Sequence, residues 1–197
     1  MTRESPHADG LDGLRIAGLD ALLRQGSSRR LPPVERWSPP YCGDIGLAIR
    51  ADGTWMYGDS PIGRDRLVRL FASILIREPD GQHYLVTPVE KILVRVEDAP
   101  FLGVEMEVRG DGRQQEIIVR TGLDDVVTCG PGHRLRFAAG SSGGPFKPYV
   151  HVRRGLDARL TRPLAFDLAA LLAPNGDAVA GAMGVWSGGE WFPLPAD

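Results

Sequence analysis

The chain has 197 residues, of which 43% are hydrophobic and 24% are charged, and its formal net charge is −2. These values are typical of a globular protein with one sizeable core or two smaller ones. The slight negative charge argues against a nucleic-acid polymer as a partner, because proteins that bind one usually carry a basic face.

The sequence also argues against a membrane protein or a secreted one. No apolar run reaches the roughly 20 residues that a membrane helix needs, and the N-terminus MTRESPHADG lacks the apolar core of a secretory signal. We therefore expect a cytoplasmic protein without a membrane partner.

The cysteines and histidines do not form a metal-binding pattern. Cys42 and Cys129 lie far apart and form no CxxC pair, and the four histidines are scattered. This spacing argues against a disulfide scaffold and a zinc site, so we predict no metal and no cofactor. Cys42 follows Pro-Pro-Tyr, without a nearby cation or helix start to produce a reactive thiolate. We expect it to be a small buried residue.

The N-terminal segment is expected to be a helix followed by a connector. Residues 11–25 carry apolar side chains at roughly helical spacing. Gly13 and Gly18 each weaken such a helix by about 1 kcal/mol relative to alanine, so it needs a surface to dock on, and its own domain is the simplest one. The prolines of residues 26–40 predict an extended connector.

The middle of the chain predicts a hairpin, a helix and two strands. Residues 45–62 contain two strand-like runs that meet at Asp52-Gly53, a favoured tight-turn pair. Residues 62–76 carry an apolar stripe at helical spacing, with charged side chains on the other faces. Residues 83–88 and 89–98 are rich in strand-forming residues, and Pro88 between them favours an edge position or a break in the ladder.

The second half reads as a β meander from residue 101, then a strand at 149–154, a helix at 161–172 and a hairpin within 178–194. The glycines of 140–145 could cradle a phosphate, but the GK[ST] ending of a phosphate loop is missing. We interpret this stretch as a connector.

The two predicted helices carry similar stripes, and each is followed by a glycine turn and a strand. This similarity predicts that residues 44–88 and 148–192 are two copies of one β–turn–α–turn–β unit, although amphipathic helices also resemble one another by chance. The expected fold is α+β with mainly antiparallel sheets. It comprises a helix and connector over 1–35, a first domain over 36–97 and a second domain over 98–197.

Several long strings resemble a known bacterial family. The residues DGTWMYGDSPIGRDRLVRLFASILIREPDG, then YLVTPVEK, VEDAPF, HVRRGLDARLTR and GVWSGGEWF, are similar to the domain-of-unknown-function family 1285, over nearly the whole chain from residue 33. The resemblance implies a duplicated core, a C-terminal domain similar to a pleckstrin-homology barrel, and a ligand site between the domains. It also implies a nucleotide-like ligand and a signalling role, without an established activity.

Nine side chains are candidates for binding a flat, anionic ligand. They are Trp55, Tyr57, Arg64, Thr87, Glu90, Lys91, Arg153, Arg162 and Trp186. Arg64 is expected to share a face with the buried stripe, where it would clamp a phosphate or carboxylate or form a buried salt bridge. Lys91 would contact a phosphate, while Glu90 would accept from a ribose hydroxyl or anchor an arginine.

The aromatic candidates have two interpretations. Trp55, Tyr57 and Trp186 could stack on a base, which is worth about 1–3 kcal/mol, but aromatics in hairpins more often fill cores. Arg153 and Arg162 flank the second predicted helix much as Arg64 flanks the first. If the halves are related, these arginines converge on one cleft between them.

No nucleophile and base are spaced locally, so we predict no catalytic residues. The first interpretation is a non-catalytic ligand-binding or sensor protein that holds an anionic, nucleotide-like molecule between two related domains, with a role in signal transduction. The alternatives are a protein-interaction or structural module and, third, an enzyme. The oligomeric state is left open.

Overall fold

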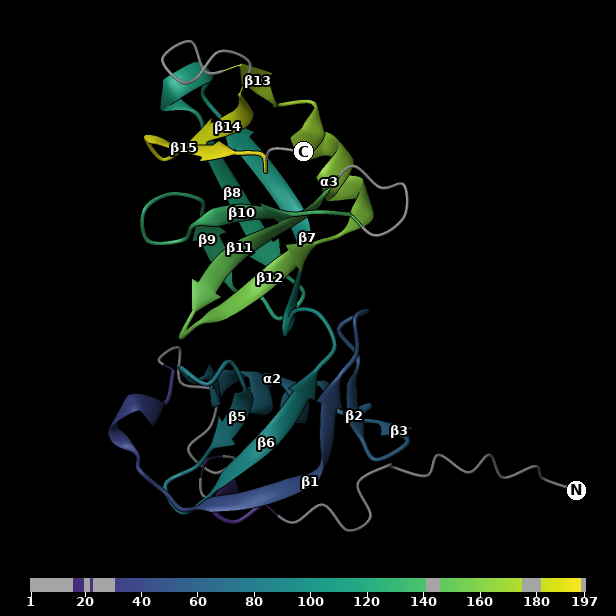
Figure 1. Cartoon of the computed structure of the whole chain (residues 1–197). Helices are drawn as coiled ribbons and strands as arrows, with labels where there is room; N and C mark the ends of the chain where they lie inside the picture. Colours follow the sequence, from purple (N-terminus) through teal and green to yellow (C-terminus); the bar gives the residue numbers. More distant parts are fainter. Residues whose placement is uncertain (1–15, 20–21, 23–30, 141–145, 175–181, 196–197) are drawn as a thin grey trace, which may run out of the picture. The chain divides into compact units, whose positions relative to one another are not determined.

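β-Strands form most of the regular secondary structure in the computed structural model, which describes residues 16–19, 22, 31–140, 146–174 and 182–195 (Figure 1). The chain divides into two units, residues 1–97 and 98–197. Each unit is built around a six-stranded sheet, and the second also contains a three-stranded sheet. Among the described residues, no helix has the length and apolar character needed to cross a membrane.

In its described residues from 31 onward, the first unit contains a short 3₁₀ turn, six strands and the α-helix α2. In chain order these are η1 (Val34–Arg36), β1 (Tyr41–Ile49), β2 (Trp55–Tyr57), β3 (Ser60–Pro61), α2 (Asp65–Ser73), β4 (Leu75–Arg77), β5 (His83–Val86) and β6 (Lys91–Val96). The strand order is β3-β2-β1-β6-β5-β4. The central pair, β1 with β6, is parallel, and the other pairs are antiparallel.

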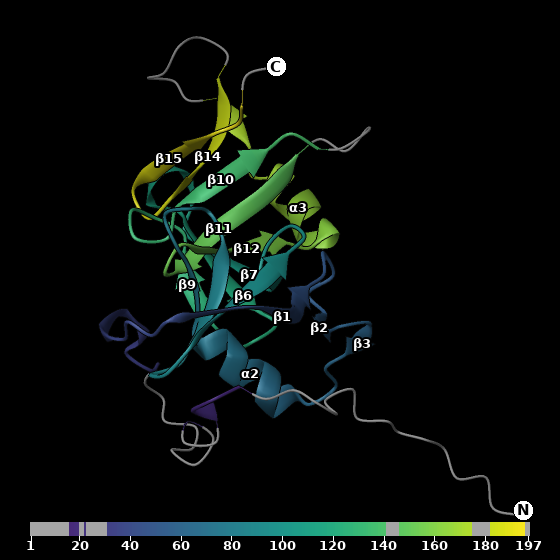
Figure 2. The same cartoon turned by 60° about the horizontal axis from the view of Figure 1, so that its bottom comes forward.

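Helix α2 covers one side of the first sheet (Figures 1 and 2). Leu67 and Phe71 lie four residues apart, so they share one helix face, and both are buried. The Phe71 ring packs on Trp55 of β2, with centroids 5.7 Å apart. The buried side chains Leu47 and Ile49 of β1 complete this part of the core.

In its described residues, the second unit contains the remaining strands, a 3₁₀ turn and the α-helix α3. In chain order its elements are β7 (Phe101–Arg109), η2 (Gly112–Gln114), β8 (Glu116–Thr121), β9 (Val126–Thr128), β10 (Leu135–Ala138), β11 (Lys147–Arg153), β12 (Leu156–Leu160), α3 (Arg162–Ala169), β13 (Ala173–Pro174), β14 (Met183–Ser187) and β15 (Glu190–Pro193). The large sheet has the order β10-β11-β12-β7-β8-β9, and the small one is β13-β14-β15. The central pair, β12 with β7, is again parallel.

The two six-stranded sheets therefore share one strand order. Each consists of two three-stranded meanders, and the first strand of one meander lies parallel to the last strand of the other. The position of the helix differs. Helix α2 connects the two meanders of the first sheet, whereas α3 follows the second meander of the second sheet.

This difference makes the predicted pairing of residues 44–88 with 148–192 wrong. The strands before and after α2, β3 and β4, are the two edges of one sheet, whereas those around α3, β12 and β13, belong to different sheets. A helical stripe reports only that one face of a helix is buried. It does not report which strands the flanking residues join.

The predicted helices at 62–76 and 161–172 are confirmed as α2 and α3, although both are shorter. The hairpin within 178–194 is confirmed as β14 and β15. Most of the expected N-terminal helix at 11–25, and residues 141–145 of the glycine-rich connector, lie outside the described residues.

Candidate functional site

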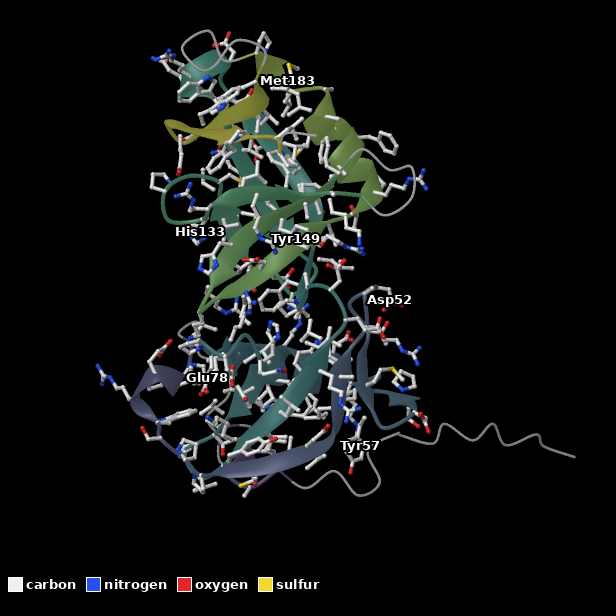
Figure 3. All side chains as sticks on the ribbon, in the orientation of Figure 1. Asp52, Tyr57, Glu78, His133, Tyr149 and Met183 are labelled. Carbon is white, nitrogen blue, oxygen red and sulfur yellow. The ribbon has the colours of Figure 1, made fainter. Side chains whose placement is uncertain are left out.

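Polar side chains gather on one face of the strands β10, β11 and β12, which we call the polar face. Side chains alternate between the two faces of a strand, and Tyr149 lies opposite Arg159 on one neighbour and Arg136 on the other. Val150 and Ala158 point to the other face and are fully buried. The side chains of the polar face are Arg136, Lys147, Tyr149, His151, Asp157 and Arg159. Tyr149 is labelled in Figure 3.

Three of these side chains converge on the carboxylate of Asp98. The Tyr149 hydroxyl donates to Asp98 Oδ1 at 2.6 Å, and Arg159 Nη1 donates to Oδ2 at 3.1 Å. Lys147 Nζ lies 3.6 Å from Asp98 Oδ2. The Asp98 side chain is only 16% exposed, so this carboxylate is held by a phenol and two cations within the second unit.

Arg136 is stacked on Tyr149. Its guanidinium carbon lies 4.0 Å from the centroid of the Tyr149 ring, and its Nε and Nη2 donate to Asp157 Oδ2 at 3.0 and 2.8 Å. His151 Nδ1 lies 3.5 Å from Asp157 Oδ1. Burial, together with the hydrogen bond to Asp98, raises the pKa of Tyr149 to about 12, so its hydroxyl remains a donor at neutral pH.

The first unit contains a related group on β5, the strand that corresponds to β11. The Tyr84 hydroxyl donates to Asp80 Oδ2 at 2.8 Å, and this bond is the main cause that raises the pKa of Tyr84 to about 12. Lys91 Nζ lies 4.7 Å from the ring centroid and donates to both Glu78 oxygens at 2.9 and 3.0 Å. Lys91, predicted to contact a phosphate, is thus paired with a carboxylate.

Thr87 and Glu90 accept hydrogen bonds from backbone groups of their own unit. Thr87 is fully buried, and its hydroxyl oxygen accepts from the backbone N–H groups of Val89 and Glu90 at 3.3 and 3.1 Å. The Glu90 carboxylate accepts from the backbone N–H of Ala17. A Cβ at Gly18 would lie 3.2 Å from Val89 Cγ2. The expectation that the N-terminal segment docks on its own domain is confirmed for its described residues.

Arg64 is exposed, so the expectation that it shares a face with the buried stripe is wrong. The helix begins at Asp65, and Arg64 is its N-cap residue with an extended backbone. Its carbonyl oxygen accepts from the N–H groups of Leu67 and Val68 at 2.9 and 3.1 Å. Helical periodicity therefore does not apply to this side chain.

Trp55 and Tyr57, the aromatic candidates of the first unit, lie on β2. Trp55 is 2% exposed and packs on Phe71, so it fills the core. Tyr57 is half-buried and lies opposite Leu47 of β1; it is labelled in Figure 3. The interpretation that aromatics in hairpins fill the core, and not that they stack on a base, is therefore confirmed for Trp55.

Arg153 belongs to β11 but does not lie on the polar face. A register shift between His151 and Arg153 turns the last part of the strand over. Arg153 forms an ion pair with Asp125, its side chain is 13% exposed, and its guanidinium carbon lies 4.8 Å from the centroid of the Phe101 ring. These contacts hold the guanidinium against side chains of the second unit.

Arg162 and Trp186 also contact side chains of their own unit. The guanidinium carbon of Arg162, the first residue of α3, lies 5.7 Å from the Phe166 ring centroid. The rings of Trp186 and Trp191 have centroids 5.5 Å apart, and the Arg113 guanidinium carbon lies 5.0 Å from the Trp186 ring centroid. We predicted that these arginines border one cleft with Glu90 and Lys91, and this stays a prediction.

The sequence reasoning missed the polar face. The strings KPYVHVR and LDARL alternate polar or aromatic side chains with apolar ones, and a period of two places the alternating residues on one face of a strand. This signal would have grouped Lys147, Tyr149 and His151. The contribution of Asp98 comes from outside the strands and has no such signal.

The two cysteines should differ in reactivity. Cys42 is exposed, so the expectation that it is buried is wrong, whereas Cys129 is buried. Burial raises the pKa of Cys129 to about 12, and the thiolate is the reactive form. We therefore expect a chromogenic disulfide reagent at pH 8 to titrate one thiol per folded chain and two after unfolding. Modification of Cys129 in the folded Cys42→Ser variant would contradict this.

The two halves of the chain match models of the two domains of one protein family. Residues 32–99 match the domain of unknown function (DUF1285), N-terminal domain, and residues 100–194 match the protein of unknown function (DUF1285), C-terminal domain. The chain belongs to the DUF1285 family, as its resemblance suggested.

A solved structure with high coverage agrees with this assignment. A DUF1285 family protein from Silicibacter pomeroyi DSS-3 is 44% identical, with a TM-score of 0.80 over 91% of this chain and 96% of that chain. Another, from Shewanella baltica OS155, is 28% identical, with a TM-score of 0.49 over 64% of this chain and 91% of that chain. No curated protein matches the chain.

Proposed function

We propose that this protein is a non-catalytic ligand-binding or sensor protein that holds an anionic small molecule, with a nucleotide-like compound as the first candidate and signal transduction as its role. The polar face of the second unit is the place that we assign to the anion. The stacking of Arg136 on Tyr149, beside two further cations, is the observation that carries the proposal.

The charge of this face supports an anionic ligand. The described residues of the face include three cationic side chains, Arg136, Lys147 and Arg159. Their positive charges are opposed by two carboxylates, that of Asp157 on the face and that of Asp98, which is bound to it. One positive charge is therefore in excess when His151 is neutral. Anions are attracted to such a surface at a rate that falls as ionic strength rises.

The geometry of Arg136 supports a flat ligand. Its guanidinium is oriented by the Tyr149 ring below it and by Asp157 at its edge, and its side chain is 54% exposed. A planar guanidinium in a fixed orientation offers a second face for stacking and loses little freedom when it forms a further hydrogen bond. An aromatic group that carries an oxyanion would use both properties.

The proposal predicts a ligand-dependent rise in melting temperature. Ligand at a hundredfold excess over Kd stabilises a folded protein by about 2.7 kcal/mol, so we expect nucleoside phosphates, but not the matching nucleosides, to raise the Tm of the wild type. Arg136→Ala should abolish the rise. Arg109→Ala is the matched control, because Arg109 is also exposed and also paired with a carboxylate, that of Glu107 on the same strand, β7.

The control separates loss of the site from a general loss of positive charge. If Arg109→Ala abolishes the ligand-dependent rise in Tm as fully as Arg136→Ala does, the anion binds elsewhere on the surface. If no nucleoside phosphate or other small anion shifts the wild type, the proposed function is wrong.

We also infer that the two six-stranded sheets arose by duplication, in a register different from the one the helices suggested. Their shared strand order supports copies at residues 41–96 and 101–160. A helix that follows the last strand of the second large sheet supports the likeness to a pleckstrin-homology barrel. Superposition of residues 41–96 on 101–160 tests the duplication, and strands that align in a different order would end it.

A further inference from the structure

Asp98 is held by the kind of donors that bind a free oxyanion. One hydroxyl and one guanidinium N–H donate to its two oxygens at 2.6 and 3.1 Å, and an ammonium lies 3.6 Å away. Charge-assisted donors of this kind recognise carboxylate and phosphate oxygens alike. Tyr149, Arg159 and Lys147 all lie on β11 or β12, so the sheet fixes the backbone from which these side chains extend independently of Asp98.

Asp98 itself is not fixed by a strand. β6 ends at Val96 and β7 begins at Phe101, so moving the Asp98 side chain breaks no strand pairing. The residue before it is held separately, because Glu97 N donates to Ile49 O at 3.0 Å and Glu97 Oε2 accepts from Ala51 N at 2.8 Å. The donors therefore extend from paired strands, whereas their acceptor lies in a connecting segment.

The related tyrosine of the first unit shows what a purely structural pair looks like. Asp80 also accepts from a tyrosine hydroxyl, that of Tyr84, at 2.8 Å. Its other oxygen accepts from the Gln82 backbone N–H at 2.8 Å, which closes a local turn. The neighbouring cation, Lys91, donates to Glu78 instead. Asp80 thus stabilises a turn, whereas Asp98 is held by two cations.

We propose that Tyr149, Arg159 and Lys147 form an oxyanion site that Asp98 occupies in the ligand-free protein, and that a carboxylate or phosphate of the ligand takes the place of Asp98. This inference rests on the proposed function and names the group of the ligand that the polar face recognises. Displacement needs no chemical step, because one anion replaces another at the same donors and the Asp98 carboxylate becomes hydrated.

An internal anion competes with an external one. A group tethered by a short segment acts at an effective concentration on the order of millimolar, so Asp98 weakens the binding of any external oxyanion. Removing the carboxylate should therefore raise the affinity of the site for small oxyanions by about tenfold or more. Small anions should also restore the stability that the substitution removes.

The test is a titration of the Asp98→Ala variant of the full chain with sodium formate, acetate and inorganic phosphate, at an ionic strength kept constant with sodium chloride. We expect the variant to melt below the wild type and to recover Tm as one of these anions is added. Asp80→Ala is the matched control, since it removes a carboxylate from a tyrosine but leaves no pair of cations behind. Salts that strengthen burial stabilise every protein, so recovery is measured relative to the wild type and to Asp80→Ala.

The anions distinguish the group that the site takes. Recovery with formate or acetate assigns a carboxylate ligand, and recovery with phosphate alone assigns a phosphorylated one. If no anion raises the Tm of Asp98→Ala beyond that of Asp80→Ala, the proposal is overturned and Asp98 is a structural residue. If Asp98→Ala folds in none of these solutions, the same titration of Asp98→Asn, which keeps an acceptor for Tyr149, decides between the same two outcomes.

The result is separable from that of the proposed function. In one outcome the wild type binds nucleoside phosphates through Arg136, but small anions do not raise the Tm of Asp98→Ala. This result would support the proposed function and contradict the displacement of Asp98. In the other outcome small anions restore the Tm of Asp98→Ala, but no larger anion raises the Tm of the wild type. This result would support the oxyanion site and contradict a nucleotide-like ligand.

Discussion

Replacing Arg153 with alanine is expected to lower the free energy of unfolding by about 3 kcal/mol, because the change leaves the carboxylate of a largely buried ion pair without its partner. Arg153 and Asp125 are only 13% and 24% exposed, respectively, and the guanidinium also covers the Phe101 ring. Urea denaturation followed by circular dichroism measures the loss. Arg64→Ala is the control, because Arg64 is exposed and surface changes usually stay within about 0.5 kcal/mol.

The comparison decides the role of an arginine that the sequence assigned to ligand binding. If Arg153→Ala were as stable as Arg64→Ala, the ion pair with Asp125 would contribute nothing, and Arg153 would return as a candidate for the ligand. A large loss in Arg153→Ala alone would assign it to the core of the second unit.

Replacing Ser187 with alanine should cost about 2 kcal/mol, because two buried backbone groups lose their partner. Ser187 is fully buried. Its hydroxyl accepts from Ile117 N at 2.8 Å and donates to Cys129 O at 2.8 Å, so it joins the β14–β15 hairpin to β8 and to the residue that follows β9. Thermal unfolding measures the loss, and faster hydrogen exchange of the Ile117 amide localises it.

Ser60→Ala is the control for this change, because Ser60 lies on the exposed edge strand β3 and should be nearly neutral. Equal stability of the two variants would show that water replaces the Ser187 hydroxyl and that the hairpin is held by its other contacts. These include the hydrogen bond of 2.8 Å from Gln115 Nε2 to Trp186 O.

Local features of the fold could be predicted because local residues determine them. The spacing of Leu67 and Phe71 indicated α2, and both are buried. Asp52-Gly53 indicated a turn, where Gly53 takes a φ of +83° and Asp52 accepts from Thr54 N at 2.9 Å. The parallel pairing of β1 with β6 has no such local signal, because an apolar strand does not show which distant strand it will join.

The candidate site was harder to predict because residue type alone does not determine burial. Trp55, an aromatic of the type that binds flat ligands, lies in the core, while Tyr149, an equally suitable aromatic, lies on the polar face. A strict alternation along β11 would place Arg153 on the face of Tyr149 and His151, but one irregular position reverses it, since a shift of one residue moves a side chain to the other face.

The central parallel pairs affect how each unit folds. In both six-stranded sheets the first strand in sequence is bonded to the last one, and among the described strand pairings this pair joins the two meanders. Contacts between distant parts of a chain require loop closure before they contribute any stability, which slows folding. During synthesis, neither sheet can be completed until its last strand, β6 or β12, has left the ribosome. A chain interrupted before β12 would therefore expose the edge of β7, a strand ready to pair with another molecule.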